Sequence, residues 1–333
     1  MGRDLAIDVG TASTLVYRQG DGVVFDQPAV VALRAGEVVG MGDEAWTMIG
    51  GASGNVVAVR PLRQGTMTEY DMTELMLEVV LRKVGAPRFP RPRALVAVPS
   101  GSSEVERRAI EEAVHYAGAR HVTLVEEPLA AAIGAGLPVH EPIGNLVVDI
   151  GGGRSEVAMV SMGGVVAGKS VTLGGFDLDA AIQEHVRGEY GVAIGERAAE
   201  DVKIAIGSAF PVPRSNAAVV VGRDLSSGDT VEVKVSEGEI RQAMSVTIGG
   251  IVEAARTCLS EAPPELTHDV LETGMFLTGG GSLLRGIDML LAQECEVPVH
   301  RTERPRETVV LGAGLMLEHL ADYQSSFQLV RRH

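Results

Sequence analysis

The chain has 333 residues, of which 45% are hydrophobic and 22% are charged, and its formal net charge at pH 7 is −15. This length allows two domains with cores of their own, and the composition is typical of a globular protein. The strong negative charge argues against a large basic surface, so we expect no nucleic-acid partner.

Neither a membrane span nor a secretory leader is indicated by the sequence. No run approaches the ~18 apolar residues that a spanning helix requires, and a predicted strand begins close to Met1. The two cysteines, Cys258 and Cys295, are far apart and have no histidine at metal-ligand spacing, which is typical of ordinary thiols in a reducing compartment. We therefore expect a cytoplasmic protein whose membrane contact, if it has one, is peripheral.

An internal repeat is the most informative feature of the chain. Residues 6–24 and 147–166 each contain an apolar strand that ends in Asp-x-Gly, a polar turn, a second apolar strand, a glycine turn and a third strand. Paired β-hairpins fit this pattern. Any two hairpins share some of these features, but the aspartates Asp8 and Asp149 at the same strand end favour a duplication.

The rest of the first half predicts a small insertion and then strands that alternate with helices. In chain order the elements are short strands and turns over 29–70, a buried strand over 94–100, a helix over 104–119, and a strand over 121–128 that leads into a helix of small residues. Ser103 and Glu106 have the spacing of a capping box. The apolar positions at helical spacing are Val105, Ala109, Ala113 and Ala117.

The second half predicts a similar alternation with its own insertion. Short strands are predicted over 208–236, and a strand, glycine turn and helix over 274–286. The predicted helices cover 177–189, 196–206, 246–259 and 307–323. Such alternation is typical of α/β domains whose sheets, outside the hairpins, are largely parallel.

Three glycine-bearing turns follow apolar strands, at residues 8–13, 149–153 and 278–282. Glycine lets the main chain approach an anion closely, and the N–H groups of such turns form a concave anion site. One such turn is more often only a turn, but three at strand ends favour a phosphate clamp. Neither a P-loop pattern nor a GxGxxG fingerprint of a dinucleotide fold is present.

Asp8 and Asp149 occupy equivalent points in the two halves. A carboxylate beside bound phosphates requires a cation, and Mg²⁺ is often held by one or two carboxylates, phosphate oxygens and water. The pair therefore favours a magnesium site, although either aspartate alone would fit a role in capping its turn.

Glu127 stands where a predicted strand meets a helix that begins near Pro128. A carboxylate there can position a water for attack on a terminal phosphate, while the adjacent Glu126 points elsewhere. The alternative for either glutamate is an interaction with the helix dipole. Lys203 lies on a helix of mixed polarity, where a solvated lysine is the simpler interpretation.

Taken together, these residues resemble the superfamily of actin, sugar-kinase and heat-shock-chaperone ATPases, and the chain is similar to the MreB family over about residues 4–315. The resemblance is carried by many segments in family order: LAIDVGTASTLVY, NVVAVRPLRQG, ALVAVPSGSSEVERRAI, VEEPLAAAIGAGLPV, LVVDIGGG, GERAAEDVKIAIGSA, GRDL, PPEL and LTGGGSLLRG.

The resemblance implies an actin-like α/β fold with two related domains and a nucleotide cleft between them. Domain I would span 1–143, with an insertion at about 29–70, and would be completed by a C-terminal helix at about 312–333. Domain II would span 144–311, with an insertion at about 181–246. The implied activity is ATP-dependent assembly into filaments that lie on the inner face of the cell membrane and organise the membrane proteins of wall synthesis.

The resemblance also implies site residues. Asp8 and Asp149 would organise Mg²⁺ and its waters, and Glu127 would orient the attacking water, which makes Glu127 and Asp149 the candidate catalytic residues. The expected nucleotide-binding residues are Thr11, Ala12, Ser13, Gly151, Gly152, Gly153, Arg154, Glu200, Lys203, Gly279, Gly280, Gly281 and Ser282.

Two positions depart from the family pattern. Ser13 stands where the family usually has asparagine. Arg154 stands where a threonine of the family's GGGTTD stretch helps to hold the lytic water, since the stretch here is GGGRSE. Arg154 could pair with the γ-phosphate like an arginine finger, displace the water, or turn to solvent. Binding of nucleotide is therefore expected. The resemblance also implies ATP hydrolysis, and Arg154 sets beside it the hypothesis of a slow or inactive ATPase that still uses nucleotide for assembly.

A membrane loop is a further hypothesis. Residues 87–93 read PRFPRPR, so Phe89 lies among Arg88, Arg91 and Arg93. An aromatic residue among arginines can enter an anionic interface, each arginine adding about 1 kcal/mol near the surface. An ordinary exposed loop would explain the segment equally well.

Three functions compete at this point. The first is a filament-forming nucleotide switch, the second a small-molecule kinase of the same fold, and the third a scaffold paralogue that binds nucleotide without hydrolysing it. The kinase would require a catalytic aspartate and a substrate pocket that the sequence does not identify, whereas Arg154 motivates the scaffold.

Overall fold

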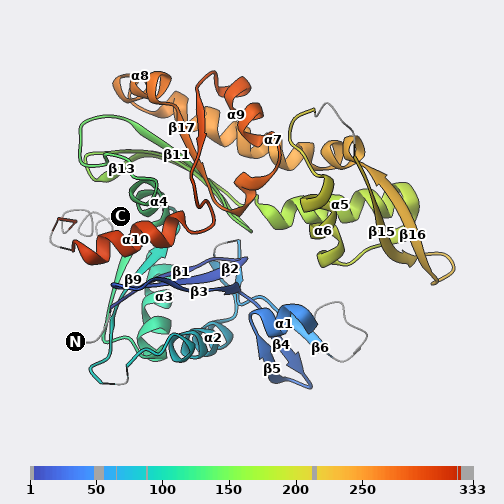
Figure 1. Ribbon diagram of the computed structural model, residues 1–333, viewed down its shortest axis with the longest axis horizontal. Helices are drawn as coiled ribbons and strands as arrows, with labels where there is room; N and C mark the ends of the chain where they lie inside the picture. Colours follow the sequence, from blue (N-terminus) through green and yellow to red (C-terminus); the bar gives the residue numbers. More distant parts are fainter. Residues whose placement is uncertain are drawn as a thin grey trace.

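Two five-stranded sheets form the frame of the computed structural model (Figure 1), which describes residues 4–48, 56–64, 66–87, 89–211, 216–320 and 322–323. The first sheet has the order β3-β2-β1-β9-β10, and its strands are β1 (Leu5–Val9), β2 (Ser13–Arg18), β3 (Gly22–Pro28), β9 (Arg93–Val98) and β10 (His121–Glu126). The second has the order β13-β12-β11-β17-β18, with β11 (Asn145–Ile150), β12 (Ser155–Ser161), β13 (Gly164–Val171), β17 (Met275–Thr278) and β18 (Val299–Arg301).

The two sheets have the same topology. In each, the first strand pairs antiparallel with the next strand of its hairpin and parallel with a later strand, β1 with β9 and β11 with β17. The register matches as well, because Leu15 lies opposite Asp8 and Glu156 lies opposite Asp149. The predicted repeat is therefore present in the structure, strand for strand.

Successive side chains of a strand point to opposite faces of its sheet, so each strand contributes residues to two different cores. Leu5 and Ile7 of β1 join a core with α2 (Tyr70–Lys83) and α3 (Glu104–Ala117), which cover the outer face of the first sheet. Their neighbour Ala6 points the other way, into a core that also contains Val147 of β11. Asp8 and Asp149 follow Ala6 and Val147 by two residues, so both carboxylates face the space between the sheets.

The middle of the molecule is filled by α4 (Glu127–Gly134) and α10 (Thr308–Glu318), which lie between the sheets in Figure 1. Their main chains pack very closely, since a Cβ on Gly134 would overlap Thr308 O and a Cβ on Gly312 would overlap Ala130 O. Only glycine allows this approach. The helix pair holds the two sheets at a fixed spacing behind the cavity described below.

The outer face of the second sheet is covered by α5 (Gly175–Tyr190), α7 (Glu237–Glu261) and α9 (Ile287–Cys295), whose apolar residues share its core. The short α8 (Pro264–Thr273) precedes β17. No helix of the described residues is both long enough and apolar enough to cross a bilayer.

Each half carries a smaller lobe, and the two lobes lie at the same end of the molecule in Figure 1. The first contains β4 (Val31–Arg34), β5 (Glu37–Met41), α1 (Asp43–Met48) and β6 (Val56–Val59), followed by the short hairpin of β7 (Leu62–Arg63) and β8 (Thr66–Met67). The second contains β14 (Val192–Ala193), α6 (Glu196–Ile206), β15 (Ala217–Asp224) and β16 (Thr230–Ser236). Parts of both predicted insertions, residues 49–55, 65 and 212–215, lie outside the described residues.

Several predicted elements agree with the structure and several need correction. The capping box of Ser103 and Glu106 is confirmed. Val105, predicted on the buried face of α3, is 78% exposed, because the buried stripe instead runs through Arg107, Ile110 and Val114.

Three further boundaries differ. Helix α7 begins at Glu237, well before the predicted residue 246, because Ser236 and Glu239 form a capping box that the sequence reading passed over. The turn after β17 continues as a short 3-10 helix, η1 (Gly280–Leu283), and α9 begins only at Ile287. The closing helix α10 ends at Glu318, and residues 321 and 324–333 of the predicted C-terminal helix lie outside the described residues. The predicted domain boundaries stay predictions.

Candidate functional site

A cavity of about 520 Å³ opens between the two sheets and the two lobes. Its size is within the range of small-molecule and cofactor sites. Most of the predicted site residues line it, namely Asp8, Thr11, Ala12, Ser13, Glu127, Asp149, Gly151, Gly152, Gly153, Arg154, Glu200, Lys203, Gly279, Gly280 and Gly281. Ser282 does not, because its buried hydroxyl donates to Gly279 O at 2.6 Å.

The first two glycine turns have the same main-chain geometry. Gly10 N donates to Ser13 O at 3.0 Å, and Gly151 N donates to Arg154 O at 2.9 Å. They also meet, since a Cβ on Gly152 would lie only 2.5 Å from the Cβ of Ala12. The structure therefore brings the two turns of the repeat together in the wall of the cavity.

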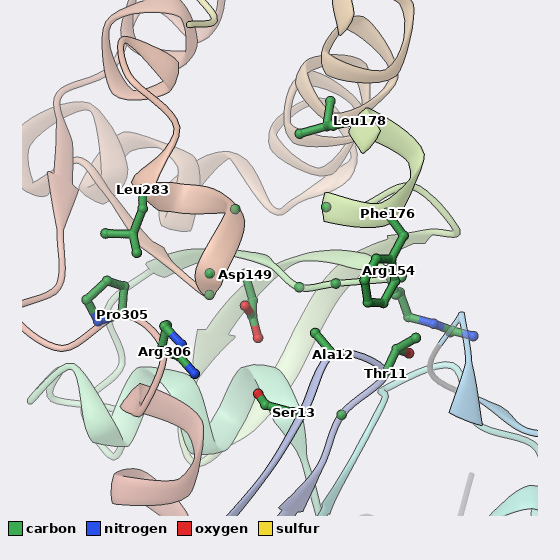
Figure 2. Close-up of a pocket in the computed structure, with 18 of the residues that line it drawn as sticks. Thr11, Ala12, Ser13, Asp149, Arg154, Phe176, Leu178, Leu283, Pro305 and Arg306 are labelled. Atoms are coloured by element: carbon green, nitrogen blue, oxygen red, sulfur yellow. The ribbon is translucent and has the colours of Figure 1, made fainter. Parts of the chain in front are cut away.

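The third glycine turn closes against the second strand end. Gly279 has a φ of +79°, and a Cβ there would overlap the Asp149 carboxylate and Ile150 O. This residue must be glycine on both counts, conformation and space. Figure 2 shows the Asp149 side chain pointing from its strand into the space between the three turns, toward Ser13.

Four carboxylates gather at the inner end of the cavity: Asp8, Glu127, Asp149 and Glu156. Burial is the largest influence on all four and raises each pKa. The pKa of Asp8 rises to about 7, with Asp26 adding to the effect of burial, and the pKa of Asp149 rises to about 7, with Asp8 and Glu156 adding to it. An unpaired buried negative charge is costly, so this arrangement suits a cation.

The donor set fits magnesium held largely by water and phosphate. Among the described residues no group of three or more histidine, cysteine or acidic side chains is arranged as a ready metal site. Two carboxylates, Asp8 and Asp149, at the edge of a glycine clamp are nevertheless the kind of partial coordination that Mg²⁺ accepts when phosphate oxygens complete its shell.

Glu127 is the first residue of α4, and Pro128, the next residue in the chain, favours the start of a helix at this point. Burial raises its pKa well above the ordinary value, with further contributions from Glu156, Asp8 and Asp149, while Arg154 acts in the opposite direction. The adjacent Glu126 points away from the cavity and pairs with Arg107 at 3.2 Å. Glu127 is therefore the glutamate of this pair that can reach a bound molecule.

Arg154 leaves the carboxylate cluster and crosses to the other half of the molecule. Its Nε donates to Gln64 O at 2.8 Å and its Nη1 donates to Ser170 Oγ at 3.1 Å. In Figure 2 the side chain runs away from Asp149. Of the three alternatives open for this arginine, the structure favours an outward position, anchored on protein atoms.

Glu156, the last residue of the GGGRSE stretch, also joins the two halves. It is 3% exposed, and its carboxylate accepts bonds from Ser100 N and Ser100 Oγ, both at 3.2 Å. Sequence reasoning did not single it out as a site residue. Its position opposite Asp149 in the hairpin register was the signal that could have identified it.

Lys203 is not the solvated lysine that its helix pattern suggested. Its Nζ donates to Gly175 O at 3.0 Å and to Asp179 Oδ2 at 2.9 Å, and Asp179 is only 1% exposed. Burial raises the pKa of Asp179 to about 6, and Lys203 opposes that rise. The pair fixes the lysine at the cavity wall beside Glu200.

Several cavity residues were not predicted. From the lobes come Trp46, Arg60 and Ile204, from α5 comes Phe176, and from the side near the third glycine turn come Leu283, Leu284, Arg285, Pro305 and Arg306. Arg306 pairs with Asp26 of β3 at 2.9 Å. These residues form apolar and positively charged parts of the cavity wall. The glycine and aspartate motifs of the sequence give no indication of them.

Comparison with known proteins gives consistent matches. The model of the MreB/Mbl protein family matches residues 2–325. The chain is 47% identical over 323 residues to the cell shape-determining protein MreB of Escherichia coli strain K12, covering 95% of this chain and 93% of that protein. It is 42% identical over 321 residues to the cell shape-determining protein Mbl of Bacillus subtilis strain 168, covering 96% of each.

Solved structures agree. MreB5 of Spiroplasma citri bound to ADP superposes with a TM-score of 0.92 at 30% identity, covering 98% of this chain and 99% of that one. The same protein bound to AMPPNP gives a TM-score of 0.90 at 30% identity, covering 98% of each chain. The predicted actin-like α/β fold is confirmed by these matches.

Proposed function

Because the chain belongs to the MreB/Mbl family, we propose that it binds ATP with magnesium in the cavity between its two sheets and assembles into filaments that help to determine cell shape. The observation that carries the nucleotide site is the meeting of three glycine turns around Asp8 and Asp149 in one cavity. The nucleotides bound by MreB5 of Spiroplasma citri support the same assignment.

The roles proposed for the site follow from chemistry and position. The main-chain N–H groups of the first two turns, at Thr11–Ser13 and Gly151–Gly153, would bind the phosphates. Glu200 and Lys203 would flank the adenosine, with the turn Gly279–Gly281 on its other side. Magnesium would neutralise phosphate charge, held by Asp8 and Asp149 through water.

Hydrolysis would depend on Glu127, which is placed to accept a hydrogen bond from a water near the terminal phosphate. Arg154 supplies no hydroxyl for that water and is anchored on Gln64 and Ser170. We therefore propose slow ATP hydrolysis. A scaffold that binds ATP without hydrolysing it is the second candidate, and the same anchored Arg154 is the observation that favours it.

The proposed partners are further copies of this chain and the membrane proteins of wall synthesis, with the filament lying on the inner, anionic face of the cell membrane. Phe89 supports a membrane contact because it is 92% exposed in the loop before β9. Arg88, the first arginine of that hypothesis, lies outside the described residues.

The nucleotide site is tested by calorimetric titration with Mg-ATP. We expect one ATP per chain for the wild type and at least about tenfold weaker binding for Gly152→Ala, whose new methyl group would press on Ala12. Gly188→Ala is the matched control, since a Cβ there meets nothing within 4 Å. Absence of ATP binding by the folded wild type would contradict the proposal.

A further inference from the structure

One side chain, Arg60, connects the two lobes across the mouth of the cavity. It follows β6 in the first lobe, and its Nη2 lies 2.5 Å from Glu196 Oε1, at the start of α6 in the second lobe. Only 14% of the arginine side chain is exposed, against 40% of the glutamate side chain. The arginine end of the ion pair is therefore largely buried, and solvent and salt screen its charge only weakly.

The same guanidinium group also lies close to two aromatic rings. Its Cζ is 4.1 Å from the ring centre of Phe176, the second residue of α5, and 5.4 Å from the ring centre of Trp46 in α1. Both separations are within the range of cation–π attraction. Trp46 belongs to the same lobe as Arg60, whereas Phe176 belongs to the second half, so the stack too crosses from one half to the other.

We propose that Arg60, Trp46, Phe176 and Glu196, here called the Arg60 clasp, form a gate that limits how fast a nucleotide enters and leaves the cavity. The inference rests on the proposed nucleotide site. Arg60, Trp46 and Phe176 line the cavity, and Glu196 does not.

The gate follows from where the contacts lie. Separation of the first lobe from the second half of the molecule would leave Arg60 with Trp46 but remove it from both Phe176 of α5 and Glu196 of α6. Each opening of the mouth therefore has to break the ion pair and the Phe176 stack together. The closed clasp hinders both the entry and the exit of a nucleotide, so weakening it speeds both association and dissociation. Loss of a direct contact to the nucleotide would instead speed dissociation without speeding association.

Glu196→Gln is the decisive variant, since it weakens the clasp without changing a residue that lines the cavity. The measurement is stopped-flow release of a fluorescent ATP analogue, chased with excess Mg-ATP, together with its association rate. We expect both rates to rise several-fold in Glu196→Gln and about tenfold in Arg60→Ala. The double variant should be no faster than Arg60→Ala, because Arg60→Ala already removes the ion pair that Glu196→Gln weakens.

Arg82→Ala is the matched control, since it removes an arginine and its ion pair with Glu78 on the exposed face of α2. Its rates should equal those of the wild type. Unchanged rates in Glu196→Gln and slower association in Arg60→Ala would overturn the gate and make Arg60 a direct contact to the nucleotide.

A second readout requires no nucleotide. Trp46 is the single tryptophan of the chain, so its fluorescence reports on the clasp directly. Quenching by acrylamide should increase in Glu196→Gln and in Arg60→Ala, and equal quenching in all proteins would contradict a closed clasp. A wild type that binds no analogue would overturn the proposed function and the gate with it, whereas binding with unchanged rates in both variants would overturn the gate alone.

Discussion

The guanidinium group of Arg154 is bound to the main-chain oxygen of Gln64, with Nε and O 2.8 Å apart. This hydrogen bond joins the second glycine turn to the β7–β8 hairpin of the other half. The arginine side chain also runs away from Asp149 (Figure 2). A position at which the family pattern has a threonine hydroxyl is thus used here to tie two halves of the fold together.

Replacing this arginine should change catalysis more than binding. In Arg154→Thr a hydroxyl returns beside the proposed water, so we expect phosphate release to rise by about tenfold or more, while ATP affinity changes little. Phosphate release under saturating Mg-ATP measures the first, and calorimetry the second. A loss of phosphate release in this variant would instead identify Arg154 as a group that stabilises the transition state.

Glu127→Gln should stop hydrolysis and keep nucleotide binding. The amide cannot accept a proton from water, so phosphate release should fall by about 10²-fold or more. The protein should also become more stable without ligand, because burial and neighbouring carboxylates disfavour the charge on Glu127. Glu126→Gln is a useful comparison, since Glu126 pairs with Arg107 away from the cavity. If Glu127→Gln released phosphate at a rate within threefold of the wild type, Glu127 would be excluded as the water-positioning residue.

Stability without nucleotide and magnesium should decrease as the pH rises. Burial raises the pKa of Asp149 from 3.8 to about 7, so the folded protein holds this proton more tightly than the unfolded chain does. The free energy of unfolding should therefore fall between pH 4 and pH 7, by up to about 4 kcal/mol from this group.

Asp149→Asn removes that penalty. Urea denaturation across this pH range should find the variant more stable than the wild type at pH 8 and similar to it at pH 4. Asp229→Asn, in an exposed turn, serves as the control. An equal pH slope in the Asp149 variant and the wild type would show that Asp149 carries no such penalty.

Membrane contact through the loop before β9 is tested by co-sedimentation with anionic liposomes. If Phe89 enters the interface, Phe89→Ser should reduce the bound fraction several-fold, since burying an aromatic side chain contributes about 1.5–3 kcal/mol. Tyr116→Ser, which removes another exposed ring from α3, is the control. Unchanged binding by the Phe89 variant would remove this loop from the membrane account.

The repeat made much of the fold and part of the site predictable. Asp8 and Asp149 follow from the matching strand ends, and alternation along β1 and β11 explains why both face the middle. Short motifs of this kind are local in the chain, so the sequence carries them in a form that can be read directly.

Other parts depend on contacts between distant elements. Lys203 has the pattern of a surface lysine, yet its partner Asp179 lies on another helix that packs beside it. Arg60 meets Phe176 only because the first lobe faces the start of α5 in the second half. Helix periodicity does not contain this information. For Lys203 tertiary packing overrode the simpler interpretation, and for Arg60 the sequence motifs gave no indication of its contacts.

Filament formation is tested most directly by pelleting the purified protein with Mg-ATP, Mg-ADP or a non-hydrolysable ATP analogue, while phosphate release is followed in the same tubes. We predict polymer with ATP and with the analogue, little polymer with ADP, and slow phosphate release with ATP. Absence of polymer under every condition, in protein that binds ATP, would contradict the filament function.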